Sequence, residues 1–169
     1  MSAVEFDRLP DDARLWVFAA SRALEPAEGE ALLERVDHFL ERWLAHGAEV
    51  VGGRELRHGR FLLVGADERA TGVSGCSIDT LFHALAALEE ELGVTLRDSG
   101  PVQFRDEEGA IRSVPRSEFR LMARTGEVTE ETVVFDNTVA TVGEARAGRW
   151  ETRLRDTWHA RAFPVAATA

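Results

Sequence analysis

Hydrophobic positions along the chain change their spacing several times, and each change predicts a new structural element. The apolar run "RLWVFAAS" over 14–21 follows the turn signal "LPDD" and is typical of a buried strand. From Pro26 to His46 the apolar residues recur at helical spacing, and Gly47 follows as an expected C-cap. This apolar stripe consists of Leu32, Val36, Phe39, Leu40 and Trp43.

The next segment, "EVVGGRELRHGRFLLVGAD", predicts a β-hairpin. Two strand-like runs over 49–57 and 60–66 flank His58-Gly59, a pair suited to a two-residue turn. The glycines at 52 and 53 suggest a β-bulge in the first strand. After the loop "DERATGVSG", a second amphipathic helix is expected from Ile78 to Leu92, with Gly93 just after it.

The remaining pattern predicts four shorter elements. They are a hairpin over 102–114, a helix over 117–123, a strand over 132–135 and a helical turn in "DTWHARAF". The order strand, helix, strand, strand, helix, strand is that of the ferredoxin-like split βαβ unit. We therefore expect an α+β fold with a ferredoxin-like core, a mainly antiparallel sheet, an extra hairpin and a C-terminal extension. Residues 1–169 are expected to form a single domain, and its sheet edges leave room for a homodimer.

The composition of the chain limits the kinds of partner that it is expected to bind. A net charge of −10 argues against general nucleic-acid binding, which depends on neutralising phosphates. No apolar run approaches the roughly 18 residues of a membrane helix, so no membrane insertion is expected. The acidic start "MSAVEFDRLPDD" does not resemble a signal peptide. We therefore expect a cytoplasmic protein.

All 20 basic residues are arginine, and the chain has no lysine. A P-loop lysine and a lysine Schiff base are therefore excluded. The sequence contains neither HExxH nor a Cys-x-x-Cys pair, so a zinc site would need Cys76, His83 and His159 to converge. We expect no metal and no cofactor. Any acid–base catalysis would therefore use the five histidines, the carboxylates or the single thiol.

The only cysteine, Cys76, lies in "SGCSID" at the expected start of the second helix. Free N–H groups and the positive end of the helix dipole favour a thiolate there. In an enzyme, Cys76 would attack a carbonyl or thioester, His159 would move the proton, and Asp136 or Asn137 would orient the imidazole. Free cysteine also often packs as a small buried hydrophobe, and the sequence leaves this interpretation open.

A non-enzymatic interpretation uses the same turn. The backbone at Ser74, Gly75 and Ser77, together with the Arg57 side chain, would hold an anionic small molecule or a protein partner. In this case the protein is a binding or adapter module and no bond is broken. Spacing along the chain does not decide between an enzyme and a binding module.

The spaced blocks "LPDDARLWVF", "WLAHG", "SGCSID", "VFDNTV" and "WHARAF" cover nearly the whole chain. In these blocks the sequence resembles a small uncharacterised bacterial family whose members are often labelled "ABC transporter ATPase". The resemblance implies a bacterial, cytoplasmic protein and carries no catalytic residues to transfer. The ATPase label conflicts with the sequence, because the chain has no Walker A loop and no lysine to complete one.

Overall fold

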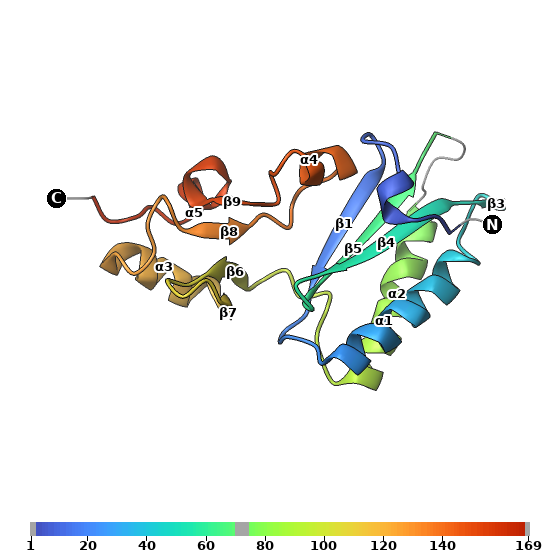
Figure 1. The fold of residues 1–169 in the computed structure, drawn as a ribbon, viewed down its shortest axis with the longest axis horizontal. Helices are drawn as coiled ribbons and strands as arrows, with labels where there is room; N and C mark the ends of the chain where they lie inside the picture. Colours follow the sequence, from blue (N-terminus) through green and yellow to red (C-terminus); the bar gives the residue numbers. More distant parts are fainter. Residues whose placement is uncertain (1–2, 70–74, 168–169) are drawn as a thin grey trace.

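The computed structural model describes residues 3–69 and 75–167, and the side chain of Cys76 lies outside the described part. Helices and antiparallel sheets build the protein, so the fold is α+β as expected. Figure 1 shows two lobes, an N-terminal one with the two long helices and a C-terminal one with shorter elements. Among the described residues, no helix is both long and apolar enough to span a bilayer.

The N-terminal lobe is a three-stranded sheet covered on one face by two helices (Figure 1). Its elements are β1 (Arg14–Ala19), α1 (Pro26–Leu40), β4 (Val51–Arg57), β5 (Phe61–Asp67) and α2 (Gly75–Leu92). The strands lie in the order β1-β5-β4, and both pairs are antiparallel. Phe18, Leu62 and Val64 face the helices, whereas Leu15, Phe61 and Leu63 face the opposite core, as the two-residue period of a strand requires.

Two sequence predictions for this lobe need correction. The helix expected to reach His46 ends at Leu40, and a two-stranded ribbon follows, made of β2 (Leu44–Ala45) and β3 (Ala48–Glu49). His46 and Gly47, with φ of 52° and 79°, form the turn of this ribbon and not a helix C-cap. The bulge expected at Gly52-Gly53 is absent, because both residues pair in regular register with Ala66 and Gly65.

Those two glycines instead permit close packing. A Cβ on Gly52 would lie 2.9 Å from Leu40 Cδ2, and one on Gly53 would lie 3.0 Å from the carbonyl oxygen of Val4. The predicted two-residue hairpin turn is confirmed. His58 and Gly59 both have positive φ, and the Arg60 N–H donates to the carbonyl of Arg57 at 3.0 Å.

The C-terminal lobe is a four-stranded antiparallel sheet with its own core. Its strands, in the order β7-β6-β8-β9, are β6 (Val102–Arg105), β7 (Ile111–Val114), β8 (Val133–Phe135) and β9 (Glu151–Arg153). The expected second hairpin, short helix, strand and helical turn correspond to β6–β7, α3 (Arg116–Thr125), β8 and α5 (His159–Ala162). Phe104, Phe119 and Phe163 are at the centre of this core.

The two lobes share a third core on the face of the N-terminal sheet that the long helices leave free. It combines Phe61 and Leu63 with Phe135 and Trp150 from the C-terminal part of the chain. Three short elements complete the fold: η1 (Phe6–Arg8), α4 (Val142–Arg146) and η2 (Leu154–Asp156). The strand that follows α2 joins the second sheet, so described residues fill the position next to β1 only at its start, by a bridge between Arg14 and Thr141.

Candidate functional site

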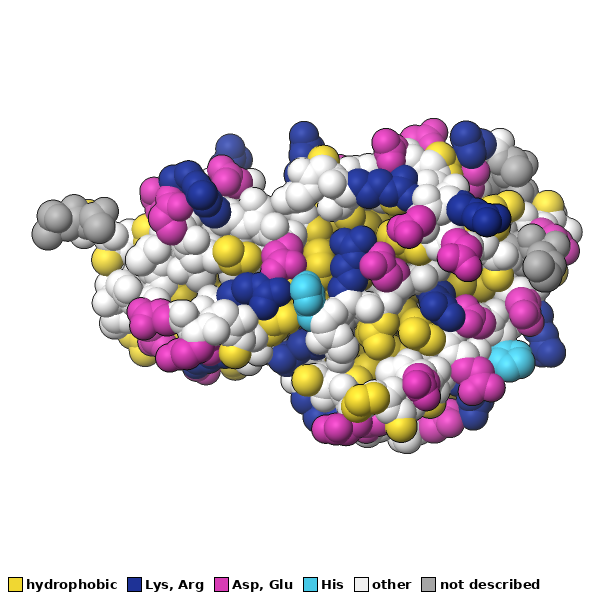
Figure 2. Space-filling model, in the orientation of Figure 1, with side chains coloured by type: hydrophobic (Ala, Val, Ile, Leu, Met, Phe, Trp, Pro, Cys, Tyr) yellow, Lys and Arg dark blue, Asp and Glu magenta, His cyan; other side chains and the backbone are white. Residues whose placement is uncertain are grey.

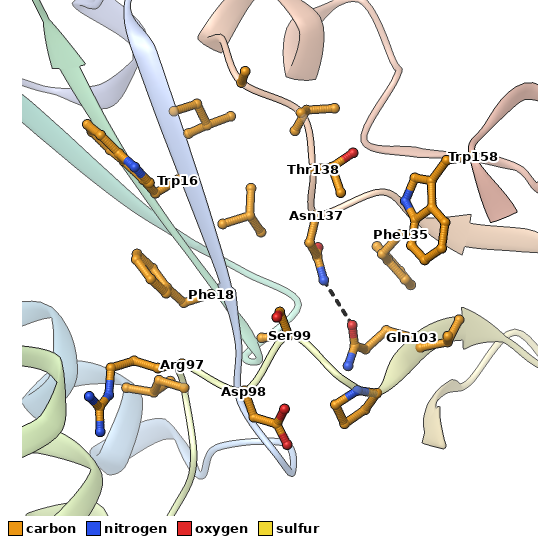
Figure 3. Close-up of a pocket in the computed structure, with 18 of the residues that line it drawn as sticks. Trp16, Phe18, Arg97, Asp98, Ser99, Gln103, Phe135, Asn137, Thr138 and Trp158 are labelled. Carbon is orange, nitrogen blue, oxygen red and sulfur yellow. Dashed lines mark hydrogen bonds between the residues drawn. The ribbon is translucent and has the colours of Figure 1, made fainter. Parts of the chain in front are cut away.

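A pocket of about 490 Å³ lies between the lobes along the outer edge of β1. In Figure 3, β1 lies on one side of the pocket, Asn137 and Thr138 lie on the other, and Ser99 and Gln103 lie below Asn137 in this view. The lining is mostly apolar and aromatic, with a few polar groups, as in sites that bind small molecules or peptides. The aromatic lining residues are Trp16, Phe18, Phe82, Phe135 and Trp158.

The β1 wall offers backbone hydrogen-bonding groups to this pocket. The N–H of Leu15 points away from β5, because it donates to the carbonyl of Ala140 at 2.9 Å. Because the backbone direction alternates along a strand, the N–H and C=O groups of Val17 and Ala19 point to the same outer edge. None of the hydrogen bonds found between described residues uses these outer groups. The edge is therefore available to a ligand.

The open part of this edge is short. At one end, the Val142 N–H donates to the Ala13 carbonyl at 2.9 Å and completes the bridge between Arg14 and Thr141. Just beyond the other end, the Ser21 N–H donates to the Thr95 carbonyl at 3.0 Å. The backbone from Leu15 to Ala19 spans about 13 Å at about 3.3 Å per residue. The pocket therefore suits an extended occupant of about three or four residues.

A chain of side-chain hydrogen bonds crosses the pocket floor. Trp150 Nε1 donates to Asn137 Oδ1 at 3.0 Å, and Asn137 Nδ2 donates to Gln103 Oε1 at 2.9 Å (Figure 3). Gln103 Nε2 then donates to Ser113 Oγ at 3.0 Å. Gln103 is only 3% exposed, and buried polar side chains are stable when they are paired in this way. This chain fixes the distance between β6 and the segment after β8.

His159 lies at one end of the pocket, in a tightly packed aromatic group. Its ring stacks on Trp158 at 4.0 Å between centroids, and its Nδ1 is 2.8 Å from Thr157 Oγ1. Burial lowers the pKa of His159 from 6.5 to about 4, while Asp136 raises it and Arg116 lowers it. The imidazole is therefore neutral near pH 7 and acts as a packed hydrogen-bonding group.

Asp136 is also committed to local contacts. Its Oδ1 accepts hydrogen bonds from Trp158 Nε1 at 3.1 Å, from the Thr138 N–H at 3.0 Å and from the Thr138 hydroxyl. These donors orient the Trp158 indole, which in turn covers His159. Asp136 thus positions the aromatic wall of the pocket through Trp158.

The charged residues of the lining differ in their availability. Arg14 pairs with Glu68 at 3.4 Å, and Arg97 pairs with Glu89 at 2.8 Å. Arg116 has no carboxylate within 4.0 Å among the described residues. It donates to the Gly100 carbonyl at 3.1 Å and stacks over the Trp158 ring. Asp98 Oδ1 accepts from the Gly100 N–H at 2.8 Å. Arg116 is therefore the cation that the site can offer to a ligand.

The structure brings some of the sequence-predicted residues together. Asp136, Asn137 and His159 all lie in one region of the C-terminal lobe, and Asn137 and His159 line the pocket. Cys76 is in the first turn of α2 in the other lobe, and its side chain, like all of Ser74, lies outside the described residues. In Figure 1 the start of α2 and helix α5 lie at opposite sides of the molecule. A catalytic pair of Cys76 and His159 stays a prediction.

The residues proposed for anion binding are arranged as follows. Gly75 begins α2, and Ser77 is 2% exposed, with its carbonyl accepting from Trp43 Nε1 at 2.9 Å. Arg57 donates to Glu55 at 2.8 Å and lies over the Trp150 ring at 5.4 Å. Trp150 packs on the face opposite the helices, so Arg57 and Ser77 lie on opposite faces of the sheet. Their joint role in anion binding stays a prediction.

The sequence patterns did not predict the open edge of β1, nor a role for Gln103 or Arg116. The strand pattern of "RLWVFA" predicted β1, but nothing local to it shows which neighbour strand is missing. One overlooked signal was the Thr141-x-x-Glu144 capping box. It begins α4 and places residues 140–142 against β1.

Among the described residues, no three His, Cys, Asp or Glu side chains are grouped so that they could hold a metal ion. The pocket combines an open strand edge, aromatic walls and the guanidinium of Arg116, which has no carboxylate within 4.0 Å among the described residues. No family model, no curated protein and no solved structure matches the chain.

Proposed function

We propose that the protein is a binding module that takes a short extended peptide segment of a partner protein into the pocket beside β1. The segment pairs with the strand edge as an added β-strand. The observation that carries the proposal is the orientation of the Val17 N–H and C=O, which point to the pocket while the groups of Trp16 and Phe18 bond to β5.

The sheet order supports an occupant at this position. The order β1-β5-β4, with both helices on one face, agrees with the first five elements of a ferredoxin-like unit. In such a unit the last strand lies beside the first. In this protein the chain after α2 passes to the second sheet, so a partner strand would fill the position beside β1.

The pocket walls suit the side chains of such a strand. Successive side chains of an extended peptide point to opposite faces. One set would meet Phe18 and Phe82 near α2, and the other would meet Phe135 and Trp158. Main-chain hydrogen bonds would then provide affinity, and these aromatic contacts would favour apolar side chains.

A selection with displayed random hexapeptides tests the proposal. Val17→Pro is the matched variant, because it removes the outward N–H without removing a β1–β5 bond, and proline is tolerated where a strand edge faces solvent. We expect enriched peptides to bind the native protein and to lose at least tenfold in affinity for Val17→Pro. Phe18→Pro is the folding control, since it removes a bond to β5 and should lower the melting temperature much more.

Amide exchange measured by NMR gives the second readout. Binding of an enriched peptide should slow the exchange of the Val17 and Ala19 amides while leaving Trp16 and Phe18 unchanged. The proposal is wrong if no peptide is enriched, or if enriched peptides bind a folded Val17→Pro variant as well as the native protein.

A further inference from the structure

Most arginines of this acidic protein are paired with carboxylates. Ion pairs within 4.0 Å involve arginines of both lobes. Figure 2 shows the result on one face, where dark blue and magenta side chains lie next to each other over much of the surface. Arginines without such a partner therefore stand out.

Helix α3 carries a row of these exceptions. Arg116, Arg120 and Arg124 are four residues apart, and no carboxylate of the described residues lies within 4.0 Å of them. This spacing places the three on one side of the helix, about 6 Å apart along its axis. The row flanks the buried stripe of Phe119, Met122 and Ala123.

Aromatic residues near the C-terminus hold two of the guanidinium groups in place. Arg116 lies over Trp158 at 5.3 Å from the ring centroid, and Arg120 lies over Phe163 at 5.6 Å. Stacking on a ring leaves the N–H groups at the edge of a guanidinium available for an anion. Two of the three guanidinium groups are therefore held in place before any ligand binds.

The row begins at the pocket, because Arg116 is both its first member and a lining residue. We propose that the partner carries an acidic stretch directly next to the apolar segment that enters the pocket, and that the arginine row binds it. This inference rests on the proposed function and specifies the class of peptide that is recognised. Carboxylates form charge-assisted, often bidentate, hydrogen bonds with arginine.

An acidic peptide fits the row better than a nucleic acid does. Three arginines over about 12 Å match three or four carboxylates. A long polyanion would also meet the rest of a protein whose net charge is −10. A short acidic stretch is affected only by charges within about 8 Å at physiological ionic strength.

The test is a selection from a library in which each random hexapeptide is preceded or followed by four glutamates or by four glutamines. At 150 mM salt we expect glutamate-flanked peptides to be enriched about three- to tenfold over glutamine-flanked ones on the native protein, from two or three exposed ion pairs. The ratio should fall toward one on Arg120→Gln/Arg124→Gln. Arg116 stays unchanged in this variant because it also anchors the Gly100 carbonyl.

Arg42→Gln is the control for removing an exposed arginine elsewhere on the surface. Arg42 is exposed, has no carboxylate partner within 4.0 Å among the described residues, and lies beyond α1 in the other lobe. This variant should keep the native ratio. Melting temperatures of all three proteins show whether each variant is folded.

The outcomes separate the two proposals. If hexapeptides are enriched on the native protein to the same degree with glutamate and with glutamine flanks, the acidic stretch is rejected and the pocket proposal stays intact. No hexapeptide preference with either flank rejects the pocket, and with it this inference. An oligothymidylate that binds at 150 mM salt and is lost in Arg120→Gln/Arg124→Gln would show a nucleic-acid site instead.

Discussion

The backbone N–H of Leu15 donates to the carbonyl oxygen of Ala140 at 2.9 Å, and it is the last group on the outer edge of β1 to be paired before the pocket opens. The two residues are 125 positions apart. Because backbone groups alternate along a strand, this bond shows which later groups of β1 point to the outer edge and which point to β5. Paired and unpaired amides should therefore alternate along the strand.

Hydrogen exchange should show this alternation directly. In the free protein we expect slow exchange at Trp16 and Phe18, whose N–H groups bond to β5, and exchange faster by at least tenfold at Val17 and Ala19. The measurement is residue-resolved amide exchange by NMR. Uniformly slow exchange from Leu15 to Ala19 would mean that the outer edge is covered in solution.

His159 should make stability depend on pH. Its pKa is about 4 in the folded protein and 6.5 in the unfolded chain, so only the unfolded chain gains a proton as pH falls below 6.5. We expect about 2 kcal/mol of unfolding free energy to be lost between pH 7 and pH 5. Urea titrations at the two pH values measure this loss.

His159→Phe is the control for that loss. Phenylalanine keeps an aromatic ring against Trp158 and Phe163 and cannot take up a proton. The variant should lose less free energy between pH 7 and pH 5 than the native protein. The pKa of Glu89 is lowered to about 2, mainly by its hydrogen bond with Arg97. This carboxyl therefore changes the stability mainly below about pH 4.5, outside the range from pH 7 to pH 5.

Arg60 should be essential for stability although it forms no ion pair with any of the described residues. It is 8% exposed and donates to the carbonyls of Ala20, Ser21 and Ile111, the last of which belongs to the other lobe. Arg60→Met leaves these acceptors without their donor, and we expect a loss of about 2–4 kcal/mol of unfolding free energy. Denaturant titration measures it.

Arg54 provides the comparison. Its partly exposed ion pair with Asp37, at 2.6 Å, is the kind of contact that contributes about 0–1 kcal/mol. Arg54→Met should therefore cost much less than Arg60→Met. Equal losses would show that the carbonyl contacts of Arg60 contribute little.

Asn137→Asp should disturb the pocket floor. The amide of Asn137 accepts from Trp150 and donates to Gln103, whereas a carboxylate accepts only and would face the Gln103 carbonyl oxygen. We expect a loss of about 1–3 kcal/mol of unfolding free energy at pH 7. The chain has no exposed asparagine that could serve as a matched control. The comparison is therefore Gln103→Glu/Asn137→Asp at pH 7, in which two facing carboxylates should destabilise the protein further.

Local elements could be predicted from the sequence wherever one spacing rule applied. The stripe from Ile78 to Leu92 is helix α2, and His58-Gly59 makes the expected turn. Trp43 extended the helical pattern of α1 beyond Leu40 because it packs into the same core from a turn after the helix. Gly47 was misleading for a related reason: a positive φ serves a hairpin turn as well as a helix end.

The pocket could not be predicted, because it is assembled from distant segments. β1, the linker after α2, the residues after β8 and helix α5 all contribute to its lining. Spacing rules describe neighbours along the chain, whereas this site depends on a strand that joins the second sheet and not the first. The side chains of Asp136 and His159 contact Trp158, and that of Asn137 belongs to the pocket floor, while the catalytic roles that the sequence predicts for them stay predictions.

The long separation between Leu15 and Ala140 also matters on the ribosome. At about 5–20 residues per second, the chain between them takes roughly 6–25 s to synthesise. During that time β1 can fold with β5 and the helices, but its outer edge has no cover from residues 140–142. Unpaired edges are sites of association between nascent chains. We therefore expect the soluble yield to depend on translation rate and chaperone supply as well as on the free energy of the finished fold.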